Sequence, residues 1–500
     1  MTDPPTLPAF PALSAPPTRT PLPVRAVLRH RAFRFLAAGR TFTLFGNALA
    51  PVALSFAVLD LTGSLGDLGL VVGMRSLANV AALLFGGVLA DRVRRALILQ
   101  GSALGSAVVQ GVLALSVLLG FASLPLLLVL SLCNGVLAAL SLPAAAALTP
   151  QTVPADELRP ANALARMGMN IGVIAGSSLG GLLASTAGPG WALAVDAASF
   201  LAGSCCYLAV RGAVPAATPA PAPAPTPAPA PAPARPCPPA PPYPPTRRRP
   251  RPRPREARLS AELRSGWREF TSRSWVWVVV LQFMVVNAAV AGGLLVIGPG
   301  IADATIGRTA WGFALAAQMA GALAAGGLVA RLRVRRALLL GVAAVAFEAL
   351  PLLVLAQRPG VAVLAAALFV CGFALEWFAV AWDLSLQENV PADRLARVYS
   401  FDALGSFLAM PLGEMTAGPL ADRFGARATL LVGALLVLVV TAAAAGTRGV
   451  RTLVVTGAPA PPLTGAPAPP LTRQPRQASI VHTPQAPARR TEGEGEMSLS

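Results

Sequence analysis

Several charged side chains stand inside long apolar stretches of this chain. They are Arg40, Arg75, Asp196, Glu348, Glu376, Asp383 and Glu414. A charge at mid-bilayer costs about 2.5–3.5 kcal/mol even on the lenient translocon scale, so such a residue either snorkels or pairs structurally, or it binds and relays ions and ligands. Snorkelling or structural pairing is the interpretation for Arg40 and Asp383, because both lie near the ends of apolar stretches.

Other reactive chemistry is sparse in the sequence. His30 and His482 both fall in the tails, and the cysteines are scattered without metal-ligand or disulfide spacing. The chain contains no lysine, so the phosphate-binding motif G-x-x-x-x-G-K-[ST] cannot occur. No paired nucleophile and base stands out. The sequence therefore argues against an ATP-driven machine and against an enzyme, and it predicts neither a cofactor nor a metal site.

The elements that carry the buried charges are expected to be membrane helices. Hydrophobic residues make up 55% of the chain, and the mean hydropathy of +0.63 is too high for a soluble globule. A bilayer core takes about 20 apolar residues per helix, which gives about twelve spans and an all-α integral membrane protein. The apolar runs are continuous, which excludes the alternating strands of a barrel. The predicted spans are 36–60, 68–90, 96–120, 124–147, 164–187, 190–210, 275–298, 309–330, 337–356, 361–383, 398–420 and 426–446.

The arginines set the expected orientation in the membrane. All 40 basic residues are arginine, and the formal net charge is +18. Arginines gather before the first predicted span and after the second, so the positive-inside rule places both termini and the long central segment in the cytoplasm. No apolar run precedes the first arginines as it would in a cleavable signal. We therefore expect a multi-pass protein of the cytoplasmic membrane.

Two phrases recur in the same order along the chain. "GGVLADRVRR" begins at residue 86 and "GGLVARLRVRR" at 326, while "VPADELRPANAL" begins at 153 and "VPADRLARVYSF" at 390. A common offset of about 240 residues indicates two homologous halves of about six spans each. The halves are predicted over residues 33–210 and 274–448. The second copy of the first phrase carries Arg331 where the first carries Asp91.

Low-complexity segments flank and join the halves. Residues 211–257 alternate Pro and Ala, which favours an extended cytoplasmic spacer, and residues 1–32 and 449–500 are predicted to be disordered cytoplasmic segments. The run Arg247–Arg255 could bind nucleic acid, but beside a membrane the expected partner is anionic lipid, at about 1 kcal/mol per arginine. Residues 258–273 predict an amphipathic helix in the membrane interface.

The first basic phrase carries a family resemblance. The residues that fit the cytoplasmic signature G-x-L-A-D-R-x-G-R-R include Gly87, Asp91, Arg92 and Arg95. Together with the two halves and the basic central segment, the phrase resembles the major facilitator superfamily over residues 33–448. The pieces "VPADELRPANAL", "RSGWREF" and "RVYSFDALGSF" are further similar to the branch of enterobactin exporters and transmembrane secretion effectors. The resemblance implies a fold of two six-helix bundles and the transport of a small molecule.

The same resemblance implies a latch at the signature. Asp91 would face the start of the eleventh span, where the helix dipole and Arg397 stabilise a carboxylate. Such a contact would close the inner side in one conformation and break in the other. The alternative is that Asp91, Arg92 and Arg95 serve only to set the topology.

The fifth span carries a glycine at every fourth position. These residues are Gly168, Gly172, Gly176 and Gly180. Such a stripe allows close helix packing. The stretch also resembles the family's antiporter signature G-x-x-x-G-P-x-x-G-G, except that Ser177 stands where the proline belongs. Close packing and a role in antiport are therefore alternatives.

In the family that the chain resembles, the first, fourth, seventh and tenth spans line the central cavity. Glu376, which follows this pattern, is the first candidate for proton coupling and Glu348 the second, because a desolvated carboxylate can alternate between protonated and ionised forms. The candidates for holding the substrate are Asn47, Asn134, Gln282, Asn287 and Trp377. The alternative for the amides is that each satisfies a neighbouring polar group.

Two classes of function follow. The first is a secondary transporter of a small amphipathic molecule such as a drug, secondary metabolite or siderophore, with proton-coupled efflux expected and proton-coupled uptake as its alternative. The second is a non-transporting membrane sensor or scaffold that reads ligands through the Pro/Arg-rich segment. The expected partners are the small-molecule substrate, protons and membrane lipids, without nucleic acid, and the chain is expected to act as a monomer.

Overall fold

The computed structural model consists of helices at the predicted spans. It describes residues 27–92, 95–154, 157–213, 268, 270–329, 336–357 and 360–453. In this part of the chain, 11 helices are long and apolar enough to cross a membrane. Nearly all of the predicted spacer 211–257 with its run Arg247–Arg255, most of the predicted interfacial helix 258–273 and most of the two predicted disordered segments lie outside the described residues.

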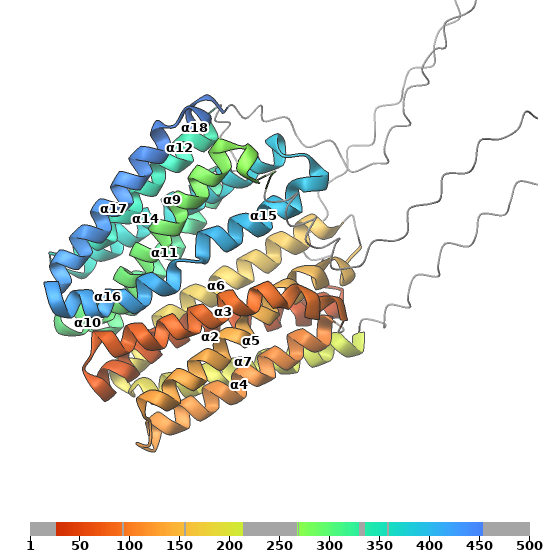
Figure 1. The fold of residues 1–500 in the computed structure, drawn as a ribbon. Helices are drawn as coiled ribbons and strands as arrows, with labels where there is room; N and C mark the ends of the chain where they lie inside the picture. Colours follow the sequence, from red (N-terminus) through yellow and green to blue (C-terminus); the bar gives the residue numbers. More distant parts are fainter. Residues whose placement is uncertain are drawn as a thin grey trace, which may run out of the picture. The chain divides into compact units, whose positions relative to one another are not determined.

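The N-terminal half is a bundle of long helices joined by short turns (Figure 1). Its helices are α2 (Arg31–Thr62), α3 (Leu65–Arg92), α4 (Arg95–Leu118), α5 (Leu124–Leu148), α6 (Leu158–Thr186) and α7 (Pro189–Ala213). Gly63 ends α2 with a φ of 66° and donates its N–H to the Leu59 carbonyl at 2.8 Å. Only a residue without Cβ adopts this conformation at little cost, so the glycine allows the tight reversal into α3.

The C-terminal half is a second bundle with more interruptions. Its elements are α9 (Ser274–Ala291), the π-helical turn η3 (Gly292–Ile297), α10 (Gly298–Thr305), α11 (Arg308–Val329), α12 (Ala337–Ala344), the 3-10 turn η4 (Val345–Glu348), α13 (Ala349–Leu355), α14 (Val361–Asn389), α15 (Ala392–Phe407), α16 (Met410–Phe424), α17 (Ala426–Gly446) and α18 (Arg448–Thr452). The predicted seventh and ninth spans are therefore each helical along their whole length, but a π-helical turn interrupts the α-helix of the seventh and a 3-10 turn that of the ninth.

The predicted eleventh span is two helices. The chain turns at residues 408–409, between α15 and α16, and Pro411 stands in the first turn of α16. Proline has no N–H to bond backwards and favours a helix start over a helix interior. Each of the two helices is shorter than the 18 residues required of a single span, which explains why this segment is not among the 11.

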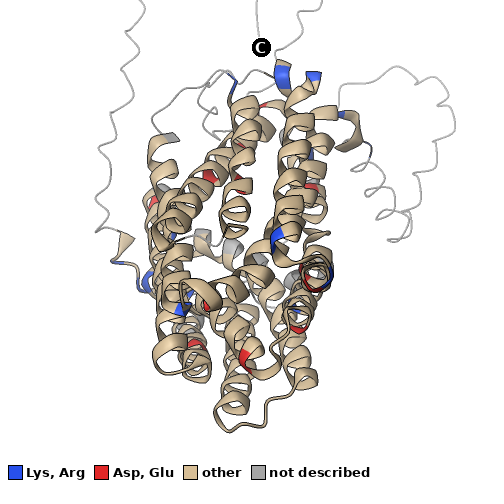
Figure 2. Ribbon diagram, turned by 90° about the vertical axis from the view of Figure 1, so that its left-hand side faces the viewer, with Lys and Arg blue, Asp and Glu red and all other residues tan. Residues whose placement is uncertain are grey.

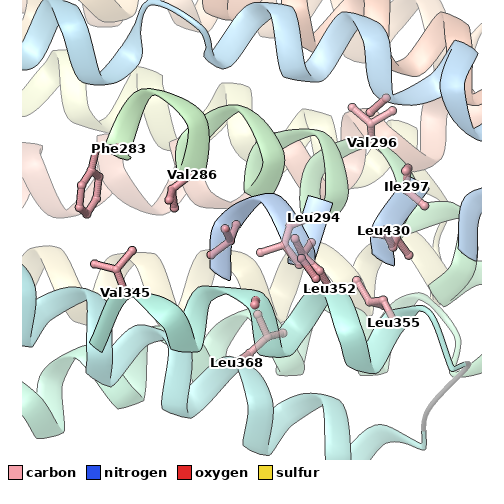
Figure 3. Packing of buried hydrophobic residues seen from close by; sticks show 14 of the residues in the cluster. Phe283, Val286, Leu294, Val296, Ile297, Val345, Leu352, Leu355, Leu368 and Leu430 are labelled. Carbon is pink, nitrogen blue, oxygen red and sulfur yellow. The ribbon is translucent and has the colours of Figure 1, made fainter. Parts of the chain in front are cut away.

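Apolar side chains fill the interior of the C-terminal half (Figure 3). Figure 3 shows Phe283 and Val286 of α9 above Val345 of η4, and Leu294 of η3 beside Leu352 of α13. Phe283 also stacks on Phe378 of α14 with ring centroids 4.3 Å apart. This packing places Glu348, the polar residue of η4, in the bundle interior, where it is 3% exposed.

The two halves meet through small residues on two helix pairs, α3 with α16 and α6 with α11. A Cβ added to Gly181 of α6 would stand 2.9 Å from the Gly312 Cα of α11. Beside this contact, the Ser185 and Thr309 hydroxyls form a hydrogen bond of 2.5 Å. On the other pair, Gly69 of α3 lies against the backbone carbonyl of Glu414. These contacts lie toward the end of the bundles opposite the first and last described residues, here called the far end.

Candidate functional site

Charged residues are sparse along the helices (Figure 2), and those inside the N-terminal half form one cluster. Asp196 of α7 has no exposed surface and accepts a hydrogen bond from the side-chain amide of Gln110 on α4. Arg75 of α3 interacts electrostatically with Asp196 and donates from Nη2 to the Asn47 Oδ1 at 3.3 Å. Gly46 makes room for this cluster, because a Cβ there would collide with Asp196.

Glu414 of α16 extends the cluster into the second half. Its side chain is fully buried, and Ser76 and Arg75 of α3 are the groups that interact with its carboxylate. Arg75 therefore lies within electrostatic reach of one carboxylate from each half. Because α3 and α16 pack against each other across the halves, a motion that separates the halves would move Glu414 away from Arg75.

A second buried carboxylate lies within the C-terminal half. Glu348 of η4 is 3% exposed, and its Oε2 accepts a hydrogen bond of 3.2 Å from the Cys371 thiol of α14. Gln318 of α11 in turn donates to the Cys371 sulfur at 3.4 Å. The Glu348 Oε1 has no hydrogen-bond partner among the described residues. A buried carboxylate with one free oxygen and a weak thiol partner is a group that can hold a proton.

Glu376, the first candidate from the sequence, is half-buried on α14. Its Oε1 lies 4.0 Å from the position that a Cβ on Gly326 of α11 would occupy, so it faces that helix. The neighbouring Trp377 stacks on Phe373 of the same helix, with centroids 6.2 Å apart. Glu376 and Cys371 of α14 thus both face α11, at Gly326 and at Gln318 respectively.

The predicted substrate-holding amides are spread over both halves. Asn134 of α5 is buried, and its Oδ1 has no hydrogen-bond partner in the described part of the chain. Gln282 of α9 donates to the Thr441 hydroxyl at 3.1 Å, and Asn287 donates to the Ser406 carbonyl at 2.8 Å. Among the amides singled out in the sequence, Asn47 is the one that both accepts a hydrogen bond from a charged group and lines a cavity.

The cavity that contains Asn47 is enclosed by helices of the N-terminal half and has a volume of about 300 Å³. Its polar lining consists of Arg40, Thr43, Asn47, Arg75, Asn79, Ser102, Ser106, Ser141 and Tyr207. We name it the polar cavity. For Arg40 the sequence indicates snorkelling or structural pairing, and the structure places its side chain in the lining of this cavity. The sequence pattern that could have revealed the cavity is the recurrence of Arg, Asn and Ser on α2, α3 and α4.

A larger cavity lies in the C-terminal half and is almost entirely apolar. Its volume is about 640 Å³, and it is lined by α9, η3, α13, α16 and α17, including Gly292, Gly293, Gly413 and Gly433. We name it the apolar cavity. It contains none of the carboxylates described above, so it offers space and apolar surface but no chemistry for protons.

The predicted latch falls at helix ends. Gly87, Asp91 and Arg92 belong to the last turns of α3, Arg95 begins α4, and Arg397 lies in α15. The side chains of all five lie outside the described residues, so the contact between Asp91 and Arg397 stays a prediction. The structure does describe the backbone on either side, with α3 ending at Arg92 and α4 beginning at Arg95.

The glycine stripe of α6 faces α2 within the N-terminal half. A Cβ on Gly168 would stand 2.7 Å from the Thr41 hydroxyl, one on Gly172 would stand 2.6 Å from the Thr41 carbonyl, and one on Gly180 would stand 3.1 Å from the Leu49 carbonyl. Gly176 lies still closer to the Phe45 carbonyl. The stripe therefore brings the two backbones together, and side chains larger than hydrogen would push the helices apart.

An ion-pair group closes the far end of the halves. Arg308, at the start of α11, donates from Nη1 to the Asp60 Oδ2 of α2 at 2.8 Å and from Nε to the Asp303 Oδ1 at 2.8 Å. Its guanidinium also stands 4.9 Å from the centre of the Phe56 ring. Asp60 belongs to the N-terminal half and Arg308 to the C-terminal half, so this pair joins the two.

These features define a multi-pass helical membrane protein whose two halves touch through small residues and keep charges buried between and within them. The chain belongs to the Major Facilitator Superfamily, whose family profile matches residues 36–414. It is accordingly a transporter-family protein of the membrane.

Similar curated proteins share part of the chain. The enterobactin exporter EntS of Escherichia coli O157:H7 (strain EC4115 / EHEC) is 32% identical over 171 residues, which are 34% of this chain and 41% of that exporter. The corresponding exporter of Citrobacter koseri (strain ATCC BAA-895 / CDC 4225-83 / SGSC4696) matches over the same share of both chains. The matched region is thus less than half of the length of these relatives.

Solved structures share the fold over most of the chain. The nucleoside transporter NupG superposes with a TM-score of 0.60 at 13% identity, covering 83% of this chain and 98% of that one. A bacterial homolog of the human lysosomal transporter Spinster gives 0.59 at 17% identity and covers 86% and 98%. The D-xylose-proton symporter gives 0.55 at 14% identity and covers 82% and 96%. At these identities the likeness concerns the fold.

Proposed function

We propose that this protein is a secondary active transporter that exports a small amphipathic molecule across the cytoplasmic membrane in exchange for protons. Both termini lie in the cytoplasm, as the arginine distribution favours. The partial match to the enterobactin exporters supports the outward direction. A fold shared with a proton symporter keeps proton-coupled uptake as the second candidate, and the experiment below separates the two.

The observation that carries this proposal is the placement of charges where the halves meet. Arg75 interacts electrostatically with Asp196 of its own half and with Glu414 of the other half. Each charge at such a depth costs about 2.5–3.5 kcal/mol, so it persists in transporters where a rearrangement makes use of it. Rocking of the halves about the contacts of α3 with α16 and of α6 with α11 changes the surroundings of this group, which is what alternating access requires.

Two gates then alternate in this proposal. The described gate is Arg308 with Asp60, which holds the far end closed. The second is the predicted latch of Asp91 on α3 with Arg397 on α15, at the end of the bundles opposite the far end. Breaking the first while forming the second exposes the interior to one side of the membrane at a time.

Proton coupling is assigned to the C-terminal half. Glu348 is the stronger of the two candidates by its surroundings, because it is buried beside Cys371 with one oxygen free. Glu376 is the second, because it is half-buried and faces α11 across Gly326. A proton neutralises either carboxylate and removes the cost of burying its charge, so proton binding favours one arrangement of the halves.

Transport into energised inverted membrane vesicles tests the proposal. Wild type is compared with Glu376→Gln, Glu348→Gln, Asp91→Asn and the control Arg448→Gln, which changes an exposed arginine at the start of the last described helix, α18. A panel of fluorescent amphipathic compounds is followed together with the pH gradient. Export predicts that at least one compound accumulates while the gradient falls, and that Asp91→Asn and at least one glutamate variant lose this activity.

The contradicting outcomes are distinct. Loss of a preloaded compound from vesicles together with the proton gradient would support uptake in place of export. Accumulation that is unchanged in both glutamate variants would remove the carboxylates from the coupling step. Transport that needs no gradient would reject secondary active transport.

A further inference from the structure

The charged side chains that line the polar cavity are basic. Among the described residues that line it, the charged ones are Arg40 and Arg75, and the other polar groups are hydroxyls and amides. Asp196 supplies a negative charge nearby, but it is fully buried against Gln110 and does not line the cavity. Glu414 also lies outside the lining. A ligand in this cavity therefore meets two guanidinium groups and no described carboxylate.

Arg75 has hydrogen-bonding capacity to spare. A guanidinium carries several N–H donors in a planar fork. Within the described residues, the hydrogen bond recorded for Arg75 goes to the Oδ1 of Asn47, which is a neutral acceptor. Arg75 lies deep in the bundle, yet part of its surface stays accessible because it faces the cavity. Donors on a desolvated cation that face an open space are suited to an anionic acceptor.

Positive charge also continues beyond Arg75. Arg40 stands near the start of α2 and Arg75 near the middle of α3, so the two line the cavity at different depths. Arg166 of α6 is exposed and adds a repulsive interaction with Arg40. The repulsion from Arg166 disfavours the charge of Arg40, and an anion beside Arg40 in the cavity would offset it.

From this geometry we propose that the polar cavity binds the anionic group of a small organic anion, with Arg75 and Arg40 as its contact residues. The volume of about 300 Å³ is at the small end of ligand sites, so it holds a single-ring or two-ring anion or the charged end of a larger molecule. Thr43 and Tyr207, whose hydroxyls share a hydrogen bond of 3.2 Å, stand at the wall as further polar groups. This inference rests on the proposed transport function and names its substrate class.

Equilibrium binding without any gradient tests the inference. The full-length protein in lipid nanodiscs is dialysed at neutral pH against naphthoate, naphthylmethanol and naphthylmethylammonium, which share one ring system and differ in charge. We expect naphthoate to bind about tenfold more tightly than the ammonium compound, the scale of one charge-assisted hydrogen bond. Arg75→Gln removes this preference, and Arg75→Lys keeps part of it because the charge remains. Arg40→Gln weakens naphthoate binding about threefold, since Arg40 is less enclosed.

The control and the contradicting results separate this inference from the transport proposal. Arg448→Gln removes an equal charge far along the chain and leaves naphthoate binding unchanged. Equal or tighter binding of the ammonium compound, no binding of any probe, or an unchanged preference in both Arg75→Gln and Arg40→Gln overturns the inference. Since Arg75→Gln is at a buried position, a monodisperse elution profile and an unaltered Tm are required of each variant. Anion-selective binding without gradient-driven transport would instead reject the proposed function alone.

Discussion

The two halves repeat the same sequence phrases but keep different polar groups in their interiors. The N-terminal half places Arg75 and Arg40 on a polar cavity and balances the deeper one with Asp196. The C-terminal half buries Glu348 beside a thiol and surrounds its own cavity with apolar side chains. The repeated fold thus provides one scaffold twice, and under the two proposals above the halves divide the work: one binds an anion and the other a proton.

The largest effect is expected from locking the far end. Ser185→Cys with Thr309→Cys replaces a hydroxyl pair 2.5 Å apart across the halves, so the sulfurs can reach disulfide distance. Oxidation should reduce transport about a hundredfold, because alternating access requires this end to open. The reductant dithiothreitol should restore it. Each single cysteine variant is the control, and full transport by the oxidised pair would show that these two helices never separate.

A smaller effect is expected from removing the buried acid. Glu348→Gln keeps the shape of the side chain and cannot release a proton. Gradient-driven accumulation should fall about tenfold or more, whereas exchange of labelled for unlabelled substrate at equal concentrations should persist, because exchange needs no net proton movement. Glu376→Gln measured in parallel ranks the two carboxylates. If neither variant changes the dependence on the gradient, the assignment of proton coupling to the C-terminal half is wrong.

The third prediction concerns the close packing in the N-terminal half. Gly176→Val places a side chain against the Phe45 carbonyl of α2. The expected cost is about 1–3 kcal/mol and a Tm lower by about 5 °C in detergent. Gly101→Val is the matched control, because a Cβ at Gly101 meets nothing within 4 Å. Equal Tm values for the two variants would show that α6 and α2 separate without strain.

The smallest effect is expected at the partly exposed gate. Arg308→Gln removes the pairs with Asp60 and Asp303, and Asp60 is 43% exposed at its side chain. Exposed ion pairs contribute about 0.2–1 kcal/mol, so the balance between closed and open forms should shift two- to fivefold. Spin-label distances across the far end measure this balance. A shift of more than tenfold would show that the Arg308 pairs contribute more free energy to the closed form than exposed ion pairs do.

The fold could be predicted closely because hydropathy is a local property. The predicted last span, 426–446, has the same bounds as α17 (Ala426–Gly446). The eleventh was predicted as one span, 398–420, and is two helices, because Pro411 and the turn at 408–409 end the hydrogen-bond ladder at a point that mean hydropathy does not register.

The site could be predicted only in part, because partners depend on packing. The sequence placed Arg75, Asp196 and Glu414 in the membrane as charged residues. It could not show that Arg75 reaches both acids, since these stand on three helices whose rotation is not encoded locally. Arg40 was set aside for its position near a span end, yet its side chain lines the polar cavity. The sequence indicates how deep a residue lies along a membrane helix, but it does not indicate which way the side chain points.

The most direct test of the division between the halves compares Arg75→Gln with Glu348→Gln in the same proteoliposomes. Naphthoate binding is measured without a gradient, and naphthoate accumulation is measured with an imposed pH gradient. The account predicts that Arg75→Gln loses binding, whereas Glu348→Gln binds like wild type and loses only the gradient-driven accumulation. Equal loss of binding in both variants, or gradient-driven accumulation retained in Glu348→Gln, would contradict it.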